Sequence, residues 1–328
     1  MTVVINGTTG VTSGSGQFDS ASTFGFKNRI INGAMMVSQR GTAFATPANL
    51  AYTVDRWLVN WAGAAPSSVN QVAGPTGYKN ALRLSGGASN TGLNTQQRIE
   101  SLNCTDLSGA TVTIQANIAV SSAQTIGWAL QYANAADNFS AVTTISSGTW
   151  SATTTATVFT ATITNLPSGA LNGLALVISP NNGAGLTSGT VDITGVQLEK
   201  GSTATSFDYR PYGTELALCQ RYFNNIGFDD VGQSNQYSGF LITTSSAFVA
   251  YSYPVALRAA PSLSYSAVGD FVINYSNSVV ATNSITGSYL GTKGASLTFG
   301  TASTLTAGQG VIVRSGNSNA RIGFSAEL

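Results

Sequence analysis

Between Leu107 and Val191 the chain carries one acidic or basic side chain, that of Asp137. Within this stretch, residues 112–120 and 125–132 alternate apolar and polar side chains. Such alternation is the pattern of a half-buried strand, and the many Thr and Val residues favour strands. Turn-forming Asn, Pro and Gly residues follow at 165–169 and 180–185. Because no helical pattern separates the short strands, the sequence predicts a β-sandwich.

The same signals predict the organisation of the whole chain, which we expect to be all-β. Residues 1–26 are rich in Gly, Ser and Thr and are expected to form an extended N-terminal attachment arm, with simple terminal disorder as the alternative. Residues 27–210 are predicted to form a β-sandwich, and residues 211–226 a hinge containing a short helix. Residues 227–328 are predicted to form a smaller C-terminal β-sandwich.

The expected elements can be placed more closely. In the first sandwich, strands are predicted at 111–120, 125–132, 155–163, 173–178 and 190–198. The helix is predicted at 214–223, with Thr214 as its N-terminal cap. In the C-terminal module, strands are predicted at 240–253, 262–268, 271–275, 295–299, 310–314 and 321–324.

Charge is scarce throughout, since charged residues make up 8% of the chain. Ordinary soluble domains contain roughly 25%. Surface charge keeps molecules apart, so we expect this surface to be covered by sister subunits or neighbours. A hydroxyl-rich protein that stays soluble alone is the other interpretation. The 14 Lys and Arg residues balance 13 Asp and Glu residues, which gives no reason to expect a nucleic-acid partner.

Missing residue types limit the chemistry. There is no His, which removes the usual general base and the commonest metal ligand. Cys104 and Cys219 match no zinc spacing and are expected to be two buried thiols, with a disulfide as the alternative. No phosphate-binding loop is present, and beyond Asp230 only Asp270 and Glu327 are acidic. We therefore predict no enzymatic activity and no cofactor.

Targeting signals are also lacking. No run reaches the roughly 18 apolar residues that a membrane span requires, so no membrane partner is expected. The first residues show no basic region followed by an apolar run, so no signal peptide is evident. These features fit a protein assembled in a host cytoplasm and released by lysis.

Three groups of segments have distinctive amino-acid sequences. They are residues 28–35, 39–41 and 52–57 near the start, residues 195–201 and 207–222 in the middle, and residues 321–328 at the end. Together they resemble a family of bacteriophage tail-fibre and appendage proteins. The resemblance implies a jelly-roll module like carbohydrate-binding sandwiches, then a smaller β module. It also implies a location in the virion, usually as a homotrimer.

The leading hypothesis is thus a structural virion protein with three parts. An N-terminal arm binds other virion proteins of the tail, neck or capsid, a jelly-roll forms the trimer, and a C-terminal module contacts host surface polysaccharide. A capsid cement or head-decoration protein is the alternative. A polysaccharide depolymerase is the third hypothesis.

Sugars are bound by aromatic faces and planar amides. The C-terminal module offers such groups, and the candidate glycan-binding residues are Asn235, Gln236, Tyr237, Tyr251, Tyr253 and Tyr289. The alternative is that the tyrosines are half-buried strand residues or trimer contacts.

Two smaller expectations concern the first module. The resemblance suggests a calcium site from Asp192, Glu199 and backbone carbonyls of the strand at residues 28–32. In residues 54–57, alternation is expected to place Val54 with Arg56 on one face and Asp55 with Trp57 on the other, with Trp57 in the core.

Overall fold

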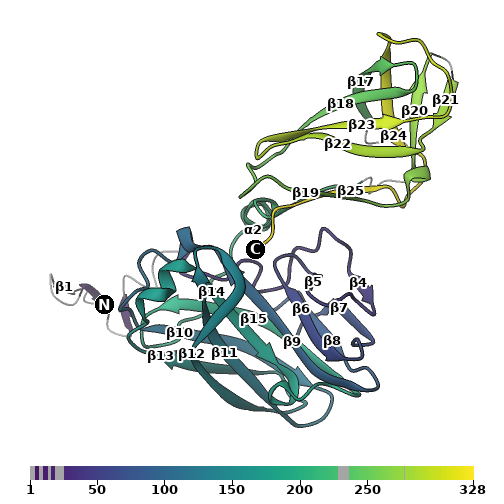
Figure 1. Cartoon of the computed structure of the whole chain (residues 1–328). Coiled ribbons are helices and arrows are strands. Elements are labelled where there is room, and N and C mark those ends of the chain that lie inside the picture. Colours follow the sequence, from purple (N-terminus) through teal and green to yellow (C-terminus); the bar gives the residue numbers. More distant parts are fainter. Residues whose placement is uncertain (1–3, 7–9, 14–15, 19–25, 228–235, 277) are drawn as a thin grey trace. The chain divides into compact units, whose positions relative to one another are not determined.

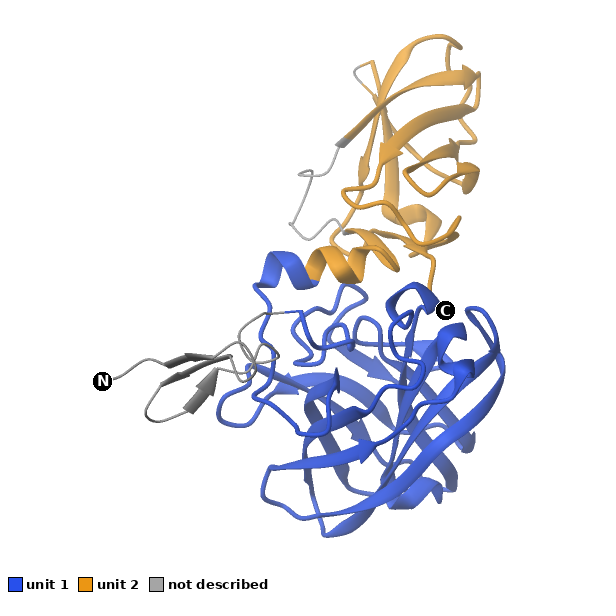
Figure 2. Ribbon diagram, turned by 90° about the vertical axis from the view of Figure 1, so that its left-hand side faces the viewer, with its two compact units in different colours: residues 1–215, 328 blue, residues 216–327 orange. Residues whose placement is uncertain are grey.

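The computed structural model describes the chain except for residues 1–3, 7–9, 14–15, 19–25, 228–235 and 277 (Figure 1). Its regular structure is dominated by antiparallel strands, which confirms the predicted all-β class. The chain forms two compact units: residues 1–215 with Leu328, and residues 216–327 (Figure 2). No helix in the described ranges is long and apolar enough to cross a membrane.

Part of the predicted N-terminal arm lies outside the described residues. The described part contains three short strands that pair in order as an antiparallel sheet. They are β1 (Val4–Asn6), β2 (Gly10–Ser13) and β3 (Gly16–Phe18). The role of this segment in attachment stays a prediction.

The first unit contains two six-stranded antiparallel sheets. The β10 sheet has the order β13-β10-β15-β8-β7-β4, and the β11 sheet has the order β12-β11-β14-β9-β6-β5. The chain crosses repeatedly from one sheet to the other, as in a jelly-roll sandwich. The strands are β4 (Ala43–Ala45), β5 (Ala51–Tyr52), β6 (Leu58–Gly63), β7 (Ser68–Ala73), β8 (Asn80–Ser85), β9 (Asn90–Ile99), β10 (Val112–Val120), β11 (Gln124–Ala135), β12 (Asn138–Ala152), β13 (Thr157–Ile163), β14 (Leu174–Ser179) and β15 (Thr190–Lys200).

The described residues include four short 3-10 helices: η1 (Ser101–Asn103), η2 (Ser168–Asn172), η3 (Pro180–Gly183) and η4 (Val268–Asp270). The turn predicted at 180–185 is confirmed, because Asn181 and Asn182 adopt the left-handed conformation that Asn tolerates (φ 47° and 51°).

The core of the first unit follows the predicted alternation. In β10, every second residue from Val112 to Val120 is buried between the sheets. In β11, Ile126 and Leu130 are fully buried, and Trp128 packs against the same core. Trp57 is fully buried there as well, as predicted.

The predicted alternation across residues 54–57 is wrong. Strand β5 ends at Tyr52, and the Trp57 N–H donates to the Val54 carbonyl at 2.9 Å, which closes a turn. Arg56 has φ 71°, a conformation that no strand contains. Val54, Asp55, Arg56 and Trp57 are therefore all buried instead of sorting onto two faces.

The helix lies slightly earlier than predicted. Helix α2 spans Tyr212–Gln220, and the Thr214 N–H donates to the Pro211 carbonyl at 3.0 Å. Thr214 is thus inside the helix and is not its cap. Phe223 starts strand β16 and pairs with Ser325, so tertiary pairing with a distant strand overrides the helical pattern there.

The second unit packs a seven-stranded antiparallel sheet and a three-stranded one around a common core. Their orders are β21-β20-β24-β17-β18-β23-β22 and β16-β25-β19. The predicted strand at 240–253 is split by a tight turn into β17 and β18. The strands are β16 (Phe223–Gly227), β17 (Gln236–Thr243), β18 (Ser246–Ser252), β19 (Ser262–Tyr265), β20 (Phe271–Tyr275), β21 (Ser278–Ala281), β22 (Ser284–Leu290), β23 (Gly294–Gly300), β24 (Gly310–Ser315) and β25 (Arg321–Ser325).

The two cysteines are buried and form no disulfide. Burial raises the pKa of Cys104 to about 12, so its reactive thiolate is scarce at neutral pH. We expect a thiol reagent to label neither residue in the native protein, and both after denaturation without reductant. A denatured, unreduced protein lacking two reactive thiols would contradict this arrangement.

Candidate functional site

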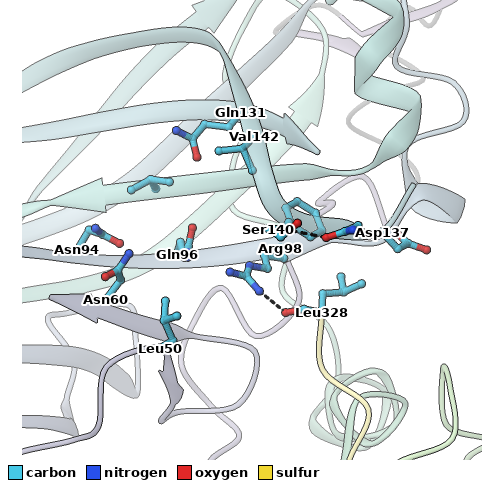
Figure 3. A pocket seen from close by; sticks show the side chains of 13 residues that line it. Leu50, Asn60, Asn94, Gln96, Arg98, Gln131, Asp137, Ser140, Val142 and Leu328 are labelled. Atoms are coloured by element: carbon cyan, nitrogen blue, oxygen red, sulfur yellow. Dashed lines mark hydrogen bonds between the residues drawn. The ribbon is translucent and has the colours of Figure 1, made fainter. Parts of the chain in front are cut away.

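A groove of about 720 Å³ lies on the outer face of the β11 sheet in the first unit (Figure 3). Its lining is largely uncharged and combines amides with a few apolar side chains. The lining residues are Leu50, Asn60, Asn94, Gln96, Arg98, Gln131, Asp137, Asn138, Phe139, Ser140, Val142, Val177 and Leu328. This volume falls within the usual range of ligand sites, about 300–1,000 Å³.

Strand register places the polar groups on one face. Asn60 on β6 pairs with Asn94 on β9, and Gln96 on β9 pairs with Val177 on β14. Gln131 extends the face onto β11 (Figure 3). Because side chains alternate along a strand, the residues between these positions point into the core. The groove floor is therefore a row of amides across neighbouring strands.

Two of these amides are not satisfied by the protein. Gln96 is 8% exposed as a residue, and its amide, which reaches the solvent of the groove, is held by no hydrogen bond from the described residues. The Asn94 Oδ1 atom is buried and also lacks a partner in the described part of the chain. Leaving a buried amide unpaired costs about 1–3 kcal/mol. Hydrogen bonds from a polar ligand in the groove would recover this free energy.

One end of the groove carries opposite charges. The Arg98 guanidinium lies over the Phe139 ring at 5.3 Å and donates to the backbone oxygen of Leu328. Asp137 accepts hydrogen bonds from the backbone N–H of Ser101 at 2.7 Å and from its hydroxyl at 3.1 Å. Neither charged group projects alone into the groove, so the site is suited to a neutral ligand.

Three of the tyrosines predicted to bind glycans lie together in the second unit. Tyr237 and Tyr251 meet edge to face at 5.8 Å, and Tyr251 meets Tyr253 in the same way at 5.6 Å. The ring of Tyr251 is stacked on Phe324 at 5.9 Å, and its hydroxyl donates to Asn224. These rings pack in or against the core of the second unit.

The other predicted glycan residues are placed differently. Tyr289 is 73% exposed on β22. Its neighbour Leu290 pairs with Ala295, which pairs with Tyr251, so Tyr289 lies on the opposite face of the sheet. Gln236 is the first residue of β17, and Asn235 lies outside the described residues. Glycan contact by these residues stays a prediction.

The buried tyrosines make the second unit sensitive to alkali. Burial raises the pKa of Tyr253 from 10.0 to about 12, with a smaller contribution from Tyr251. The folded state therefore keeps a proton that the unfolded state releases, so this stability is present below pH 10 and lost as pH rises toward 12. We expect phenolate absorbance to show several late-titrating tyrosines, and Tyr253→Phe to lower the amplitude of this late phase by one tyrosine. An unchanged amplitude in that variant would contradict the assignment.

The two calcium candidates are engaged by different cations. Arg83 donates to both carboxylate oxygens of Asp192 at 2.7 Å, whereas Glu199 accepts from Thr205 and lies 3.9 Å from the Lys27 ammonium. The two acids are seven positions apart along β15, roughly 23 Å in an extended strand. Within the described residues, no group of three or more acidic or cysteine side chains could hold a metal ion.

No family model and no curated protein matches the chain. Among solved structures, an enzymatically active domain of tailspike protein 4 of bacteriophage CBA120 is 14% identical, with a TM-score of 0.37 over 53% of this chain and 22% of that one. This chain thus spans about a fifth of that domain.

Two further structures are similar at the same level. A putative sugar binding protein from Bacteroides thetaiotaomicron is 14% identical, with a TM-score of 0.38 over 53% of this chain and 100% of that one. TmCBM61, solved with β-1,4-galactotriose, is 13% identical, with a TM-score of 0.33 over 53% of this chain and 99% of that one. These similarities are too low to assign a function.

Proposed function

We propose that the chain is a structural phage virion protein, a tail-fibre or appendage subunit, whose first unit binds neutral polysaccharide in the groove of the β11 sheet. It attaches by its N-terminal segment and assembles as a homotrimer. This function needs a polar surface with little charge and no acid–base machinery. The composition, with 8% charged residues and no His, agrees with it.

The observation that carries the binding function is the unpaired Gln96 amide. It lies in the groove and is more than nine-tenths buried. A carboxamide both donates and accepts, as sugar hydroxyls do, so the two are complementary. Leu50, Val142 and Val177 supply apolar surface for the C–H faces of a sugar. A neutral oligosaccharide matches both features.

The number of acidic side chains in the groove favours glycan binding over glycan hydrolysis. Glycosidases commonly use two carboxyl groups about 5–9.5 Å apart. Asp137 is the one acidic side chain among the described groove residues. It already accepts two hydrogen bonds from Ser101. The groove therefore fits an adhesive role, in place of depolymerase activity.

We expect Gln96→Leu to weaken binding of the best ligand from a neutral-glycan array by about tenfold, the effect of about 1.4 kcal/mol. Because no hydrogen bond from the described residues holds the Gln96 amide, Tm should be unchanged. Titration calorimetry and thermal unfolding of the full chain measure the two effects. Unchanged affinity in the folded variant would contradict binding in this groove.

Gln97 provides the matched control because it is the next residue on β9 but faces the other way. Its amide is satisfied at both ends by the backbone of Ile31, each bond being 2.7 Å long. Gln97→Leu should therefore lower the free energy of unfolding by about 1–3 kcal/mol. Any folded fraction should bind glycan normally.

The virion part of the proposal needs a separate test. An antibody fragment against the chain should label the tail or its appendages in images of the phage particle. Labelling of the head, with stoichiometric binding to empty shells, would favour a capsid cement protein instead.

A further inference from the structure

A second, smaller pocket of about 280 Å³ lies on the outer face of the β10 sheet in the first unit. It is not part of the groove, which belongs to the other sheet. Small apolar residues form most of its wall. The lining residues are Ala73, Gly74, Pro75, Ala81, Asn117, Ala119, Thr154, Ala156, Asp192 and Thr194. The volume suits one small chemical group or a single sugar ring better than a chain.

Asn117 is the unsatisfied polar group of this pocket. It is 9% exposed, and its buried Oδ1 atom has no hydrogen-bond partner in the described part of the chain. Its neighbours Ala116 and Ile118 point into the core, so the Asn117 side chain lies on the outer face with the pocket. No hydrogen bond holds the amide, so turning it toward a ligand breaks none.

A β-bulge lies beside this amide. The pairing of β10 with β15 shifts between Gln115 and Asn117, where β15 contains Gly195 with φ 57°. Bulges re-aim side chains and are frequent next to functional sites. The bulge is therefore a second feature, independent of burial, that distinguishes the position of Asn117 from the rest of β10.

Two other polar side chains of the pocket are already paired, and the Thr154 side chain is exposed. Asp192 is held by two hydrogen bonds from Arg83, and the Thr194 hydroxyl donates to the Asn80 carbonyl at 2.8 Å. The Asp192–Arg83 pair is electrically neutral. A charged ligand would have to compete with it, whereas a neutral ligand would not. The buried group left for recognition is thus the Asn117 carboxamide, surrounded by methyl groups.

We propose that this pocket binds an acetamido group, as carried by an N-acetylhexosamine of a polysaccharide. The N–H of this secondary amide donates to the unsatisfied Asn117 Oδ1 atom, whereas its carbonyl, which is trans to the N–H, points away from that atom. The acetyl methyl group then packs against Ala81, Ala119 and Ala156. A plain hydroxyl at the same sugar position can also donate to the Asn117 oxygen, but it offers no methyl contact.

The test compares N-acetylglucosamine with glucose by ligand-observed NMR titration of the full chain. We expect N-acetylglucosamine to bind about tenfold more tightly, a difference that one well-formed polar contact can supply. Asn117→Leu should abolish this preference. Ala156→Leu, which fills the pocket and leaves Asn117 in place, should abolish it too. Gln115→Leu, two residues away on the same face of β10 but outside the pocket, should leave it unchanged.

The following results would each contradict one part of the proposal. Equal binding of glucose, or full binding by folded Asn117→Leu, removes the acetamido site. Loss of binding in Gln96→Leu would move the ligand to the groove, so the two proposed sites fail separately. Tighter binding of N-acetyl-lysine amide than of N-acetylglucosamine would overturn the sugar as the source of the acetamido group.

Discussion

Glu215→Ala is expected to lower the free energy of unfolding of the first unit by about 3–5 kcal/mol. Glu215 is buried and lies 3.2 Å from the Nη1 atom of Arg210, which is buried too. Arg210 also donates to the backbone carbonyls of Asn28 and Ile30, and Glu215 accepts from the Asn32 N–H. Removing the carboxylate leaves a guanidinium charge in the interior without compensation.

Urea unfolding followed by tryptophan fluorescence measures this loss. The probe is specific, because the four tryptophans, Trp57, Trp61, Trp128 and Trp150, all lie in the first unit. Asp106→Ala is the control, since Asp106 pairs with Arg29 at 2.9 Å but is exposed. Exposed pairs contribute about 1 kcal/mol or less. Equal losses in the two variants would show that burial of the Arg210–Glu215 pair does not matter.

The sequence predicts strands well where the two faces differ in polarity. In β10, Ile114 and Ile118 face the core while Asn117 faces outward, so the period of two is visible. Strand β12 escaped prediction although it has 15 residues. Eight of these residues are Ser, Thr or Gly and nine are exposed, so no continuous apolar face shows a period in the sequence.

The groove could not be predicted for a related reason. Gln96 and Gln97 are identical in type and adjacent in sequence, yet one is an unpaired amide in the groove and the other clamps the backbone of Ile31. Only the partner strands decide which of them faces the core. Residue type alone also did not show that the Tyr251 ring stacks on Phe324, and its predicted contact with a glycan stays a prediction.

The segments that carry the family resemblance were only partly interpretable as structure. Trp57 could be assigned to the core from its size and apolar character, and it is buried there. The turn around it depends on contacts from distant residues: the Asp55 carboxylate accepts from the Gln39 backbone N–H at 2.8 Å, and the Trp57 indole donates to the Asn32 carbonyl. Such contacts have no signature in local sequence.

Gly33→Ala is expected to destabilise the first unit by about 3 kcal/mol, the upper end of overpacking effects. A Cβ at this position would lie 2.1 Å from the Val196 carbonyl oxygen. That oxygen also accepts from the Asn28 amide, and the Val196 N–H donates to the Gly33 carbonyl at 2.9 Å. The clash is with backbone that is held on both sides, so no side-chain rotation relieves it.

Gly213→Ala is the matched control for this prediction. Gly213 lies in helix α2 with open space around its Cβ position, so Ala should be neutral or stabilising by up to about 1 kcal/mol. Urea unfolding by tryptophan fluorescence compares the two variants. Gly33 and Val196 belong to segments far apart in the sequence, and a selective loss in Gly33→Ala would mean that close contact between their backbones holds these segments together. Equal stability of both variants would contradict that close approach.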